Sequence, residues 1–343
     1  MMTSMEIVRA ALQGNPAPRI PIFCNLLDQG APELGMSQAE YYARGEHVAC
    51  GQLALRTRYG YDNLWSLFYV GREAELLGCQ EILFAEDGTP NVADYFLRTA
   101  KDIESFTIPE DITRHPVWQE SARCLQVLRQ ESKGRFPICA YLTASTTLPA
   151  LLMGMDKWLE LALSGPDHLR AQLLGKCSEF FRKQVAAYRE AGADLLLYSS
   201  PFGSSSFVGM RRFRAFSLPW MQRDLTGLGV EDLIYYCGTA PINPVIGEVM
   251  QHLGLRVFYP SPKDDLAVTK ALVAGNGLTC GVIDDISMIS WTPEQTRAEV
   301  ERLCHIGMPG EHFLLGTAVM PMAVPEANIQ AYMEAAFTFG SYR

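Results

Sequence analysis

The sequence predicts a parallel eight-stranded (β/α)8 barrel, a TIM barrel, and three observations support this class. The chain has 343 residues, a length that such barrels with insertions commonly reach. Short β-prone runs alternate with amphipathic stretches of helical period, which is the pattern of a parallel α/β fold. No glycine-rich phosphate loop stands between Cys24 and Gly30, where a doubly wound sheet usually carries one. We expect one domain over residues 1–343, because no internal repeat or low-complexity linker divides the chain.

The elements follow in chain order from propensity and period. A helix over residues 4–13 precedes the first strand, which prolines introduce. Roughly 70 residues separate the second run from the third, too many for one crossover helix. This stretch contains a hairpin signal at Asp87-Gly88 and a helix from about Pro116 to Lys133, so we expect a hairpin-containing insertion between strands 2 and 3. The eight predicted strands are residues 18–25, 63–68, 136–142, 194–200, 233–238, 256–261, 278–284 and 312–317.

Composition and charge limit the classes of function. The net charge of −9, without a Lys/Arg-rich run, disfavours nucleic acid or an anionic membrane as partner. Glu6 and Arg9 interrupt the apolar segment that a signal peptide would need, and no run approaches the roughly 18 apolar residues of a membrane span. Nine cysteines without a Cys-x-x-Cys pair indicate reduced thiols. We therefore expect a soluble cytoplasmic enzyme.

Several blocks of the chain resemble the uroporphyrinogen decarboxylase superfamily. Residues 233–238, Leu-Ile-Tyr-Tyr-Cys-Gly, resemble the strand that carries His-x-Cys-Gly in that superfamily. Residues 190–194, Glu-Ala-Gly-Ala-Asp, with Leu218-Pro219 downstream, resemble its "AGAD … F … LP" block. Leu315-Gly316 and residues 325–328, Pro-Glu-Ala-Asn, resemble its last strand and the start of its last helix. The order of these blocks covers nearly the whole chain and implies the same barrel.

The decarboxylases themselves are matched poorly at their substrate site. They grip the carboxylates of the substrate with an Arg-rich segment after the first strand, where this chain has Asn25-Leu-Leu-Asp28. Trp65 lies near the place of their pyrrole-facing Asp, and Thr317 corresponds to their late His. A polyanionic porphyrinogen would meet Asn, Asp and Trp, so we do not expect porphyrinogen decarboxylation.

The corrinoid-dependent methyltransferases of the superfamily use the His and Cys of the motif, and a distant Cys on the last strand, as zinc ligands. Here Tyr235 replaces the His, Cys237 is retained, and the last strand ends at Thr317 without a thiol. A catalytic zinc ion needs three protein ligands, so we predict no zinc site, with Cys237 as the only retained candidate ligand. Three further thiols on predicted strands could converge on it, although a lone strand cysteine is more often core: Cys24, Cys139 and Cys280.

Aromatic residues take the place of the missing charged groups. If Tyr235 and Cys237 face into the barrel, period-two alternation also places hydroxyl-bearing residues at inward or mouth positions. A mouth of this kind, with Trp65 at the second strand, suits a flat apolar ring among hydroxyl donors. The competing interpretation is that tyrosines have high β-propensity and pack as core. The predicted substrate-binding residues are Asn25, Trp65, Tyr141, Tyr198, Ser200, Cys237, Tyr259 and Thr317.

Three residues are candidates for catalysis. Tyr235 is predicted to donate a hydrogen bond to a leaving oxygen, because a hydroxyl does part of what zinc does for a thiol substrate. Three carboxylates are expected near the mouth, Asp28, Asp284 and Asp285. Asp284, which matches the Asp of the family's "G-N-L-D" turn, and Asp28 are the catalytic candidates among them. An Asp after a strand is as often a turn or helix cap as a catalytic group, so both interpretations stay open.

The resulting hypothesis is a methyltransferase that moves a methyl group from a small donor, a methoxylated aromatic compound, to the cobalt of a corrinoid (cobalamin) carried by a partner protein. A quaternary amine held by cation–π contact is another donor compatible with an aromatic mouth. A decarboxylase or lyase for a small aromatic acid is the second hypothesis, with Arg211, Arg212 and Lys263 as the nearest carboxylate clamp. A non-catalytic barrel that binds a corrinoid or a partner is the third, and a homodimer is compatible with all three.

Overall fold

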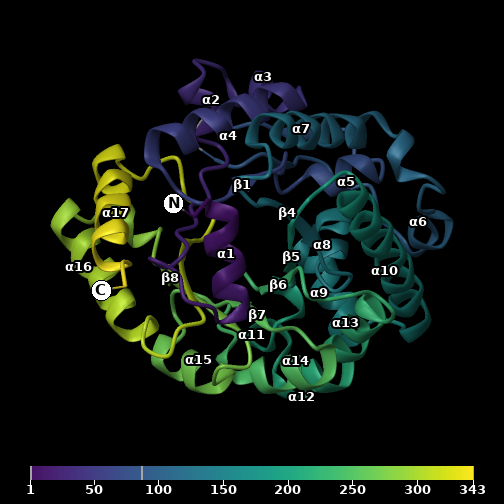
Figure 1. The fold of residues 1–343 in the computed structure, drawn as a ribbon. Helices are drawn as coiled ribbons and strands as arrows, with labels where there is room; N and C mark the ends of the chain where they lie inside the picture. The colour runs from purple at the N-terminus through teal and green to yellow at the C-terminus, as the bar shows by residue number, and fades with distance from the viewer. Residues whose placement is uncertain (1, 86–87, 343) are drawn as a thin grey trace.

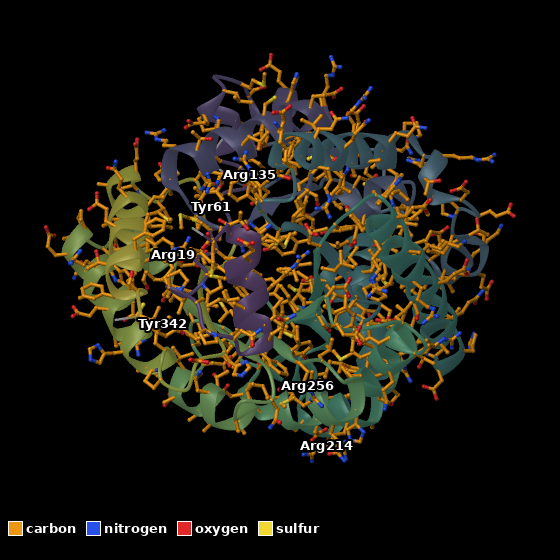
Figure 2. All side chains as sticks on the ribbon, viewed as in Figure 1. Arg19, Tyr61, Arg135, Arg214, Arg256 and Tyr342 are labelled. Atoms are coloured by element: carbon orange, nitrogen blue, oxygen red, sulfur yellow. The ribbon has the colours of Figure 1, made fainter. Side chains whose placement is uncertain are left out.

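The computed structural model describes residues 2–85 and 88–342, and its core is a ring of parallel strands surrounded by helices (Figure 1). Seven strands form one sheet in sequence order, and each pairs in parallel with the next. Side chains fill the ring that the ribbons leave open (Figure 2). The seven strands are β1 (Leu64–Trp65), β4 (Ile138–Thr143), β5 (Leu195–Ser199), β6 (Leu233–Tyr236), β7 (Val257–Tyr259), β8 (Leu278–Ile283) and β9 (Phe313–Thr317).

The first predicted strand, residues 18–25, lies between the two edge strands of this sheet. On the β9 side, the amide of Phe23 donates to the carbonyl oxygen of Leu315 at 2.8 Å. On the β1 side, the amide of Asp62 donates to the carbonyl oxygen of Ile22 at 2.8 Å. These bonds close the sheet, so the predicted eight-stranded parallel barrel is confirmed.

A buried carboxylate, Asp62, reinforces this seam with its side chain. It accepts hydrogen bonds from the amide of Ile22 at 2.8 Å and from the hydroxyl of Ser4 at 2.5 Å. The guanidinium of Arg19 donates to both of its oxygens, at 2.5 and 2.8 Å. Asp62 is fully buried, and a buried charge is tolerated when it is paired and hydrogen-bonded in this way. The Asp62 side chain thus connects the first helix and the first strand to the segment just before β1.

Helix α1 (Ser4–Gln13) crosses the open end of the ring in Figure 1. It begins with a capping box between Thr3 and Glu6 and ends at Gly14, whose φ of 66° is left-handed. Val8 and Ala11 belong to the hydrophobic cluster inside the barrel, with residues from the starts of several strands. The helix therefore covers the amino ends of the strands, and the carboxyl ends are left for ligands.

The predicted insertion lies between β1 and β4. Its hairpin pairs β2 (Ile82–Leu83) with β3 (Asn91–Val92), and the predicted turn residue Asp87 lies outside the described residues. The hydroxyl of Thr89 donates to Asp28 at 2.6 Å, which attaches the hairpin to the loop after the first strand. The insertion therefore lies over the carboxyl ends of the strands. Its helices are α5 (Arg72–Leu76), α6 (Ala100–Ser105) and α7 (Pro116–Ser132).

The remaining helices wrap the outside of the barrel (Figure 1). No helix in residues 2–85 and 88–342 combines the length and the apolar character needed to cross a membrane. The remaining α-helices are α2 (Gly30–Glu33), α3 (Gln38–Tyr42), α4 (Gly45–Tyr59), α8 (Leu148–Met153), α9 (Met155–Ser164), α10 (Asp167–Glu190), α11 (Ser205–Val208), α12 (Met210–Arg212), α13 (Leu218–Leu225), α14 (Ile246–Leu253), α15 (Leu266–Val273), α16 (Pro293–Gly307) and α17 (Glu326–Phe339).

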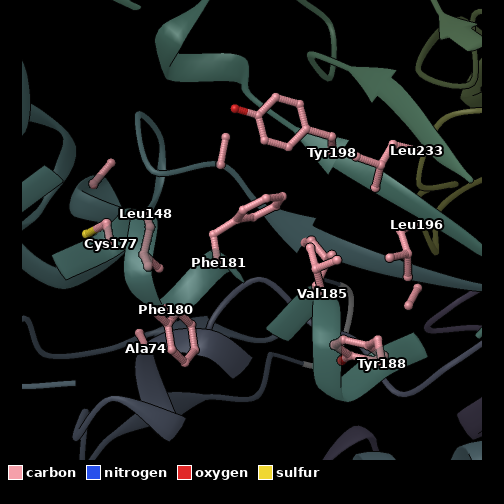
Figure 3. Close-up of a cluster of buried hydrophobic side chains, with 14 of the residues drawn as sticks. Ala74, Leu148, Cys177, Phe180, Phe181, Val185, Tyr188, Leu196, Tyr198 and Leu233 are labelled. Carbon is pink, nitrogen blue, oxygen red and sulfur yellow. The ribbon is translucent and has the colours of Figure 1, made fainter. Parts of the chain in front are cut away.

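Successive strand residues belong to two different cores. Leu196 and Tyr198 of β5 pack against α10, whose Phe181 and Val185 lie beside them in Figure 3. The alternate residues face the barrel axis and pack with one another there. Both cores are buried and apolar, as expected for a parallel sheet covered on both faces. The axis-facing residues include Cys139, Tyr141, Leu195, Leu197, Ile234, Tyr236, Val257, Tyr259, Cys280 and Val282.

Candidate functional site

A cavity of about 400 Å³ opens at the carboxyl ends of β4, β5 and β6. In a TIM barrel this end of the strands carries the active site. Four axis-facing strand residues reach the cavity, namely Tyr141, Thr143, Ser199 and Tyr236. The outer walls come from the segment after β1, the hairpin, α8, α9 and the turn after β5: Phe68, Val70, Asn91, Tyr95, Thr147, Ala150, Leu151, Met155, Pro201 and Phe202, with Val319 after β9.

Tyr141 is the centre of an aromatic stack at the base of the cavity. Phe68 lies parallel to it with ring centroids 4.3 Å apart, and Trp65 does so at 4.8 Å. Tyr236 meets the edge of Tyr141 at 6.0 Å. Because parallel rings cover its faces, Tyr141 presents its edge and its hydroxyl to the cavity. Tyr141 and Phe68 line the cavity, whereas Trp65 is fully buried beneath Tyr141 and does not reach it.

A chain of hydrogen bonds supports the Tyr141 hydroxyl. Asn25 Nδ2 donates to this oxygen at 3.1 Å and to the carbonyl oxygen of Thr317 at 2.9 Å. A carbonyl can only accept, which fixes the orientation of the Asn25 amide. Burial raises the pKa of Tyr141, so its hydroxyl keeps its proton. The amide donor polarises the O–H bond, and the proton is free to bind a group in the cavity.

Tyr259 lies behind this chain of hydrogen bonds. It faces the barrel axis, as predicted, but its hydroxyl donates to the carbonyl oxygen of Thr317 at 2.7 Å, and its side chain is fully buried. Four predicted residues, Asn25, Tyr141, Tyr259 and Thr317, are thus joined through hydrogen bonds. Tyr259 and Thr317 hold this network in place and do not line the cavity.

The inward orientation predicted for Tyr235 and Cys237 is wrong. Tyr235 is fully buried in the outer core, where its ring lies between Tyr198 and Phe258 with centroids 6.5 and 6.3 Å away. Its hydroxyl has no hydrogen-bond partner among the described residues. The Cys237 thiol donates to the carbonyl oxygen of Ser200 at 3.4 Å. The physical reason is register: Leu233 and Tyr235 face the helices, so the residues between and after them face the axis.

Tyr198 and Ser200 share this correction. The Tyr198 hydroxyl donates to Asp224 of α13 at 2.8 Å, and its ring packs edge-on to Phe181 at 5.1 Å (Figure 3). The Ser200 hydroxyl pairs with that of Thr146 at 3.0 Å and is fully buried. The strand therefore presents Ser199 to the cavity in place of these two residues. Tyr236 was not among the predicted site residues, because it has the same hydropathy as the adjacent Tyr235.

The predicted catalytic carboxylates both have structural partners. Asp284 accepts from the amide of Ser287 at 3.1 Å and from its hydroxyl at 2.7 Å, which holds the turn that follows β8. Asp28 accepts from the hydroxyls of Tyr42 and Thr89, each at 2.6 Å. Neither Asp lines the cavity, so this geometry gives no support to their predicted catalytic roles.

Asp285 is the carboxyl group with the most unusual environment at this end of the barrel. It is 2% exposed, and among the described residues its hydrogen bond comes from the amide of Ile286 at 3.1 Å, with no cation paired to it. Burial raises its pKa to about 7, and the neighbouring Asp284 adds to the increase. Its charge also contributes to the raised pKa values of Tyr141 and Tyr236, although Asp285 itself does not line the cavity. A buried carboxyl that retains its proton near neutral pH is typical of functional sites.

This pKa predicts a pH-dependent stability. The unfolded Asp ionises near pH 4, so between about pH 4 and 7 the folded protein binds one more proton, and the free energy of unfolding falls as pH rises through this window. From pH 5.5 to 8 the free energy of unfolding should fall by about 2 kcal/mol more for the parent protein than for Asp285→Asn, since each pKa unit is worth about 1.4 kcal/mol. Denaturant unfolding at both pH values measures this difference. Asp284→Asn removes only the smaller contribution of the neighbouring charge and should keep most of the parent slope, because burial is the larger cause of the shift. An Asp285→Asn slope equal to the parent's would show that Asp285 ionises normally.

The donor set does not fit the zinc ion that the family resemblance implies. In the described part of the chain, no three His, Cys, Asp or Glu side chains come close enough to hold a metal ion. Cys237 lies in the outer core, and its thiol donates to the carbonyl oxygen of Ser200. Cys24, Cys139 and Cys280 lie in the buried cores and do not converge on Cys237.

The absence of a zinc site remains a prediction with a direct test. The purified protein should contain far less than one zinc per chain and should keep its activity after chelation, because no described side chains replace the missing ligands. Elemental analysis and activity before and after dialysis against a chelator measure both quantities. About one zinc per chain, lost together with activity in Cys237→Ser, would contradict the prediction.

Comparisons with known proteins extend over the whole barrel. The sequence model of the family described as uroporphyrinogen decarboxylase (URO-D) matches residues 3–339. The chain is 22% identical over 342 residues to the methylcobamide:CoM methyltransferase MtbA of Methanosarcina mazei, with 97% of each chain covered. It is 26% identical over 307 residues to a methylated-thiol–coenzyme M methyltransferase of the same organism, covering 85% of this chain and 74% of the relative. A solved methyltransferase structure from Methanosarcina mazei matches with a TM-score of 0.85 at 19% identity, over 99% of both chains, which shows the shared fold.

Proposed function

The chain belongs to the uroporphyrinogen decarboxylase (URO-D) family, and from this premise we propose that it is a corrinoid-dependent methyltransferase that demethylates a methoxylated aromatic compound. Relatives that match over nearly their full length are named methylcobamide:CoM methyltransferases, which supports the reaction class. The observation that carries the choice of donor is the Tyr141 hydroxyl, supported by Asn25 at the base of an aromatic cavity. In the proposed reaction, the methyl group passes to the cobalt of a partner corrinoid protein.

The proposed direction of methyl transfer, from the ether donor to cobalt, rests on the residues that differ from the zinc motif. A thiol becomes a strong nucleophile only as a thiolate, and the resemblance assigns that activation to zinc held by His and two Cys. Tyr235 and Cys237 face the helices here, so this chain does not provide that ligand set at the mouth. An ether substrate needs no such activation. It needs a hydrogen-bond donor at its leaving oxygen, and Tyr141 is one.

The proposed chemical step is a nucleophilic displacement at the methyl carbon. The reduced cobalt of the corrinoid substrate attacks this carbon, the carbon–oxygen bond breaks, and its electron pair leaves on the phenolic oxygen. The Tyr141 hydrogen bond strengthens as negative charge develops on that oxygen, which lowers the barrier. The phenolate then takes up a proton from solvent at the open cavity and leaves as the neutral phenol.

Exposed apolar side chains beside the cavity support a protein partner at the mouth. Tyr95 and Met155 line the cavity and are 38% and 44% exposed. Phe207 is 40% exposed and packs edge-on to the cavity residue Phe202 at 4.9 Å. Contiguous exposed apolar groups of this kind mark interaction sites. A corrinoid protein that covers them would present its cobalt to the cavity.

The lyase hypothesis lacks its carboxylate clamp. Arg212 donates to the carbonyl oxygens of Ala162 and Leu163 on α9, and neither Arg211 nor Lys263 lines the cavity. A carboxylate substrate would therefore find no cationic partner among the described lining residues. This observation favours the methyltransferase over the lyase. A cytoplasmic location and a homodimer belong to the proposal as expectations from the sequence.

One assay separates the three hypotheses. The protein is incubated with cob(I)alamin and a panel of methoxyphenols, and methylcobalamin is followed by its absorption spectrum. The methyltransferase predicts methylcobalamin together with one equivalent of the demethylated phenol. A lyase releases carbon dioxide from an aromatic acid instead, and a binding protein produces neither. Absence of methylcobalamin with every methoxyphenol, with free cobalamin and with a corrinoid protein, would refute the proposed function.

A further inference from the structure

We propose that the methyl donor is an uncharged single-ring aryl methyl ether, and that this site discriminates against the same ring bearing a carboxylate. This inference rests on the proposed function and specifies the substrate class of the same cavity. It follows from the charges around the cavity, from the geometry of its aromatic residues and from its size.

The polar groups that line the cavity are neutral. Asn91, Thr143, Thr147 and Ser199 contribute amide and hydroxyl groups, and the described lining residues include no Lys, Arg or His. A carboxylate that leaves water for such a site has neither a cation nor a set of charge-assisted donors to replace its hydration. A phenol or an ether can instead be satisfied by single hydrogen bonds to these hydroxyls.

The aromatic residue at the base of the cavity, Tyr141, offers no free ring face to a cation. A cation binds over the face of a ring, at the negative pole of its quadrupole. Both neighbours of Tyr141, Phe68 and Trp65, are stacked on it, at 22° and 28° between the ring planes. Tyr141 therefore offers an edge and a hydroxyl, which suit a flat ring and its ether oxygen. This geometry favours an aryl ether over a quaternary amine.

The size of the cavity agrees with a single ring. Its volume of about 400 Å³ lies near the lower limit of ligand pockets, which run from about 300 to 1,000 Å³. The hairpin residue Asn91 and Tyr95 form part of its outer wall, so the insertion limits the length of the ligand. 2-Methoxyphenol and its 4-carboxylate, 4-hydroxy-3-methoxybenzoate, form a matched pair that differs only in the charged group.

The test measures binding without turnover and then methyl transfer. Isothermal titration at pH 8 should give a dissociation constant for 2-methoxyphenol at least ~10-fold lower than for 4-hydroxy-3-methoxybenzoate, as expected for an unpaired buried carboxylate. Asn91→Arg adds a cation at the exposed rim of the cavity and should shift this ratio toward the carboxylate by ~10-fold, in line with a charge-assisted hydrogen bond. Asn276→Arg, an exposed residue in the turn after α15, makes the same charge change away from the cavity and should leave the ratio unchanged.

The outcomes distinguish this inference from the proposed function. Equal or tighter binding of 4-hydroxy-3-methoxybenzoate by the parent protein would overturn the inference, while methylcobalamin formation from that compound would leave the proposed function standing. Tighter binding of trimethylphenylammonium than of 2-methoxyphenol would overturn it in favour of a cationic donor. Preferential binding of 2-methoxyphenol without methyl transfer to free or protein-bound cob(I)alamin would support the ligand class and refute the methyltransferase.

Discussion

Replacing Tyr141 with Phe should lower kcat for a methoxyaromatic substrate by about 10²–10³-fold, the usual cost of removing one transition-state hydrogen-bond donor. The hydroxyl is the only group that this substitution removes, and its partner Asn25 can still donate to the carbonyl oxygen of Thr317. The ring stack with Trp65 and Phe68 also stays in place, because Phe has the same ring. Ground-state binding of the substrate should therefore change little, and the loss should appear in kcat.

Tyr235→Phe is the matched control for this experiment. It removes the same atom from a strand tyrosine that faces the helices, where the hydroxyl has no partner among the described residues. We expect a kcat within about twofold of the parent value, since the substitution touches no group in the cavity. Steady-state kinetics at saturating corrinoid, with both variants purified in parallel, provide the comparison. Equal loss in both variants would indicate a general effect on the barrel, and loss in Tyr235→Phe alone would restore the inward orientation predicted from the sequence motif.

The sequence predicted the barrel because its signal is redundant. Each of the strands comes from a short apolar run bounded by turn residues or prolines, and an error in one run would not have changed the class. The insertion was equally visible, since the hairpin interrupts the alternation of strand and helix. The closing seam is less regular: in place of a ladder, residues 18–25 make isolated bridges to Leu315 of β9, to Val319 after β9 and to Ser341. Its prolines, which introduce the strand in the sequence, also remove amide donors from it.

The register of β6 could not be read from the sequence for a physical reason. A barrel strand is buried on both faces, so both faces carry apolar or aromatic residues. In β6 one face has Leu233 and Tyr235 and the other has Ile234 and Tyr236, two pairs of similar hydropathy. Alternation then gives no preference between the two orientations, and the motif decided it wrongly. The same alternation placed Tyr141 of β4 and Tyr259 of β7 on the axis, whereas it also placed Tyr198 of β5 there, although that residue faces the helices.

The polar residues of the site also divide into those that the order of elements places together and those that it does not. Asn25 and Thr317 come together because they lie at the carboxyl ends of neighbouring strands, which the order of elements fixes. The partners of Asp28 come from α3 and from the hairpin, and no spacing in the sequence brings Tyr42 and Thr89 to that carboxylate. Asp285 was expected near the mouth, but its burial depends on how the loop after β8 folds over the barrel.

The seam that closes the barrel should depend on Asp62. Asp62→Ala is expected to lower the free energy of unfolding by about 3–5 kcal/mol, because it leaves the Arg19 guanidinium and the Ile22 amide without their acceptor in a buried site. That is a large fraction of the stability of a typical domain. Asp62→Asn keeps one acceptor oxygen and loses the charge, so it should lie between the parent and the alanine variant.

Asp94→Ala is the control for the effect of removing an ion pair as such. Asp94 pairs with Arg98 at 2.6 Å, but both side chains are more than half exposed, so the loss should stay below about 1 kcal/mol. Urea unfolding monitored by tryptophan fluorescence and by circular dichroism measures all three variants against the parent. Equal, small losses in Asp62→Ala and Asp94→Ala would show that the backbone bonds from Phe23 and Asp62 suffice to close the barrel. A large loss confined to the Asp62 variants would show that a single buried carboxylate holds the first strand, and with it Asn25, in place beneath the cavity.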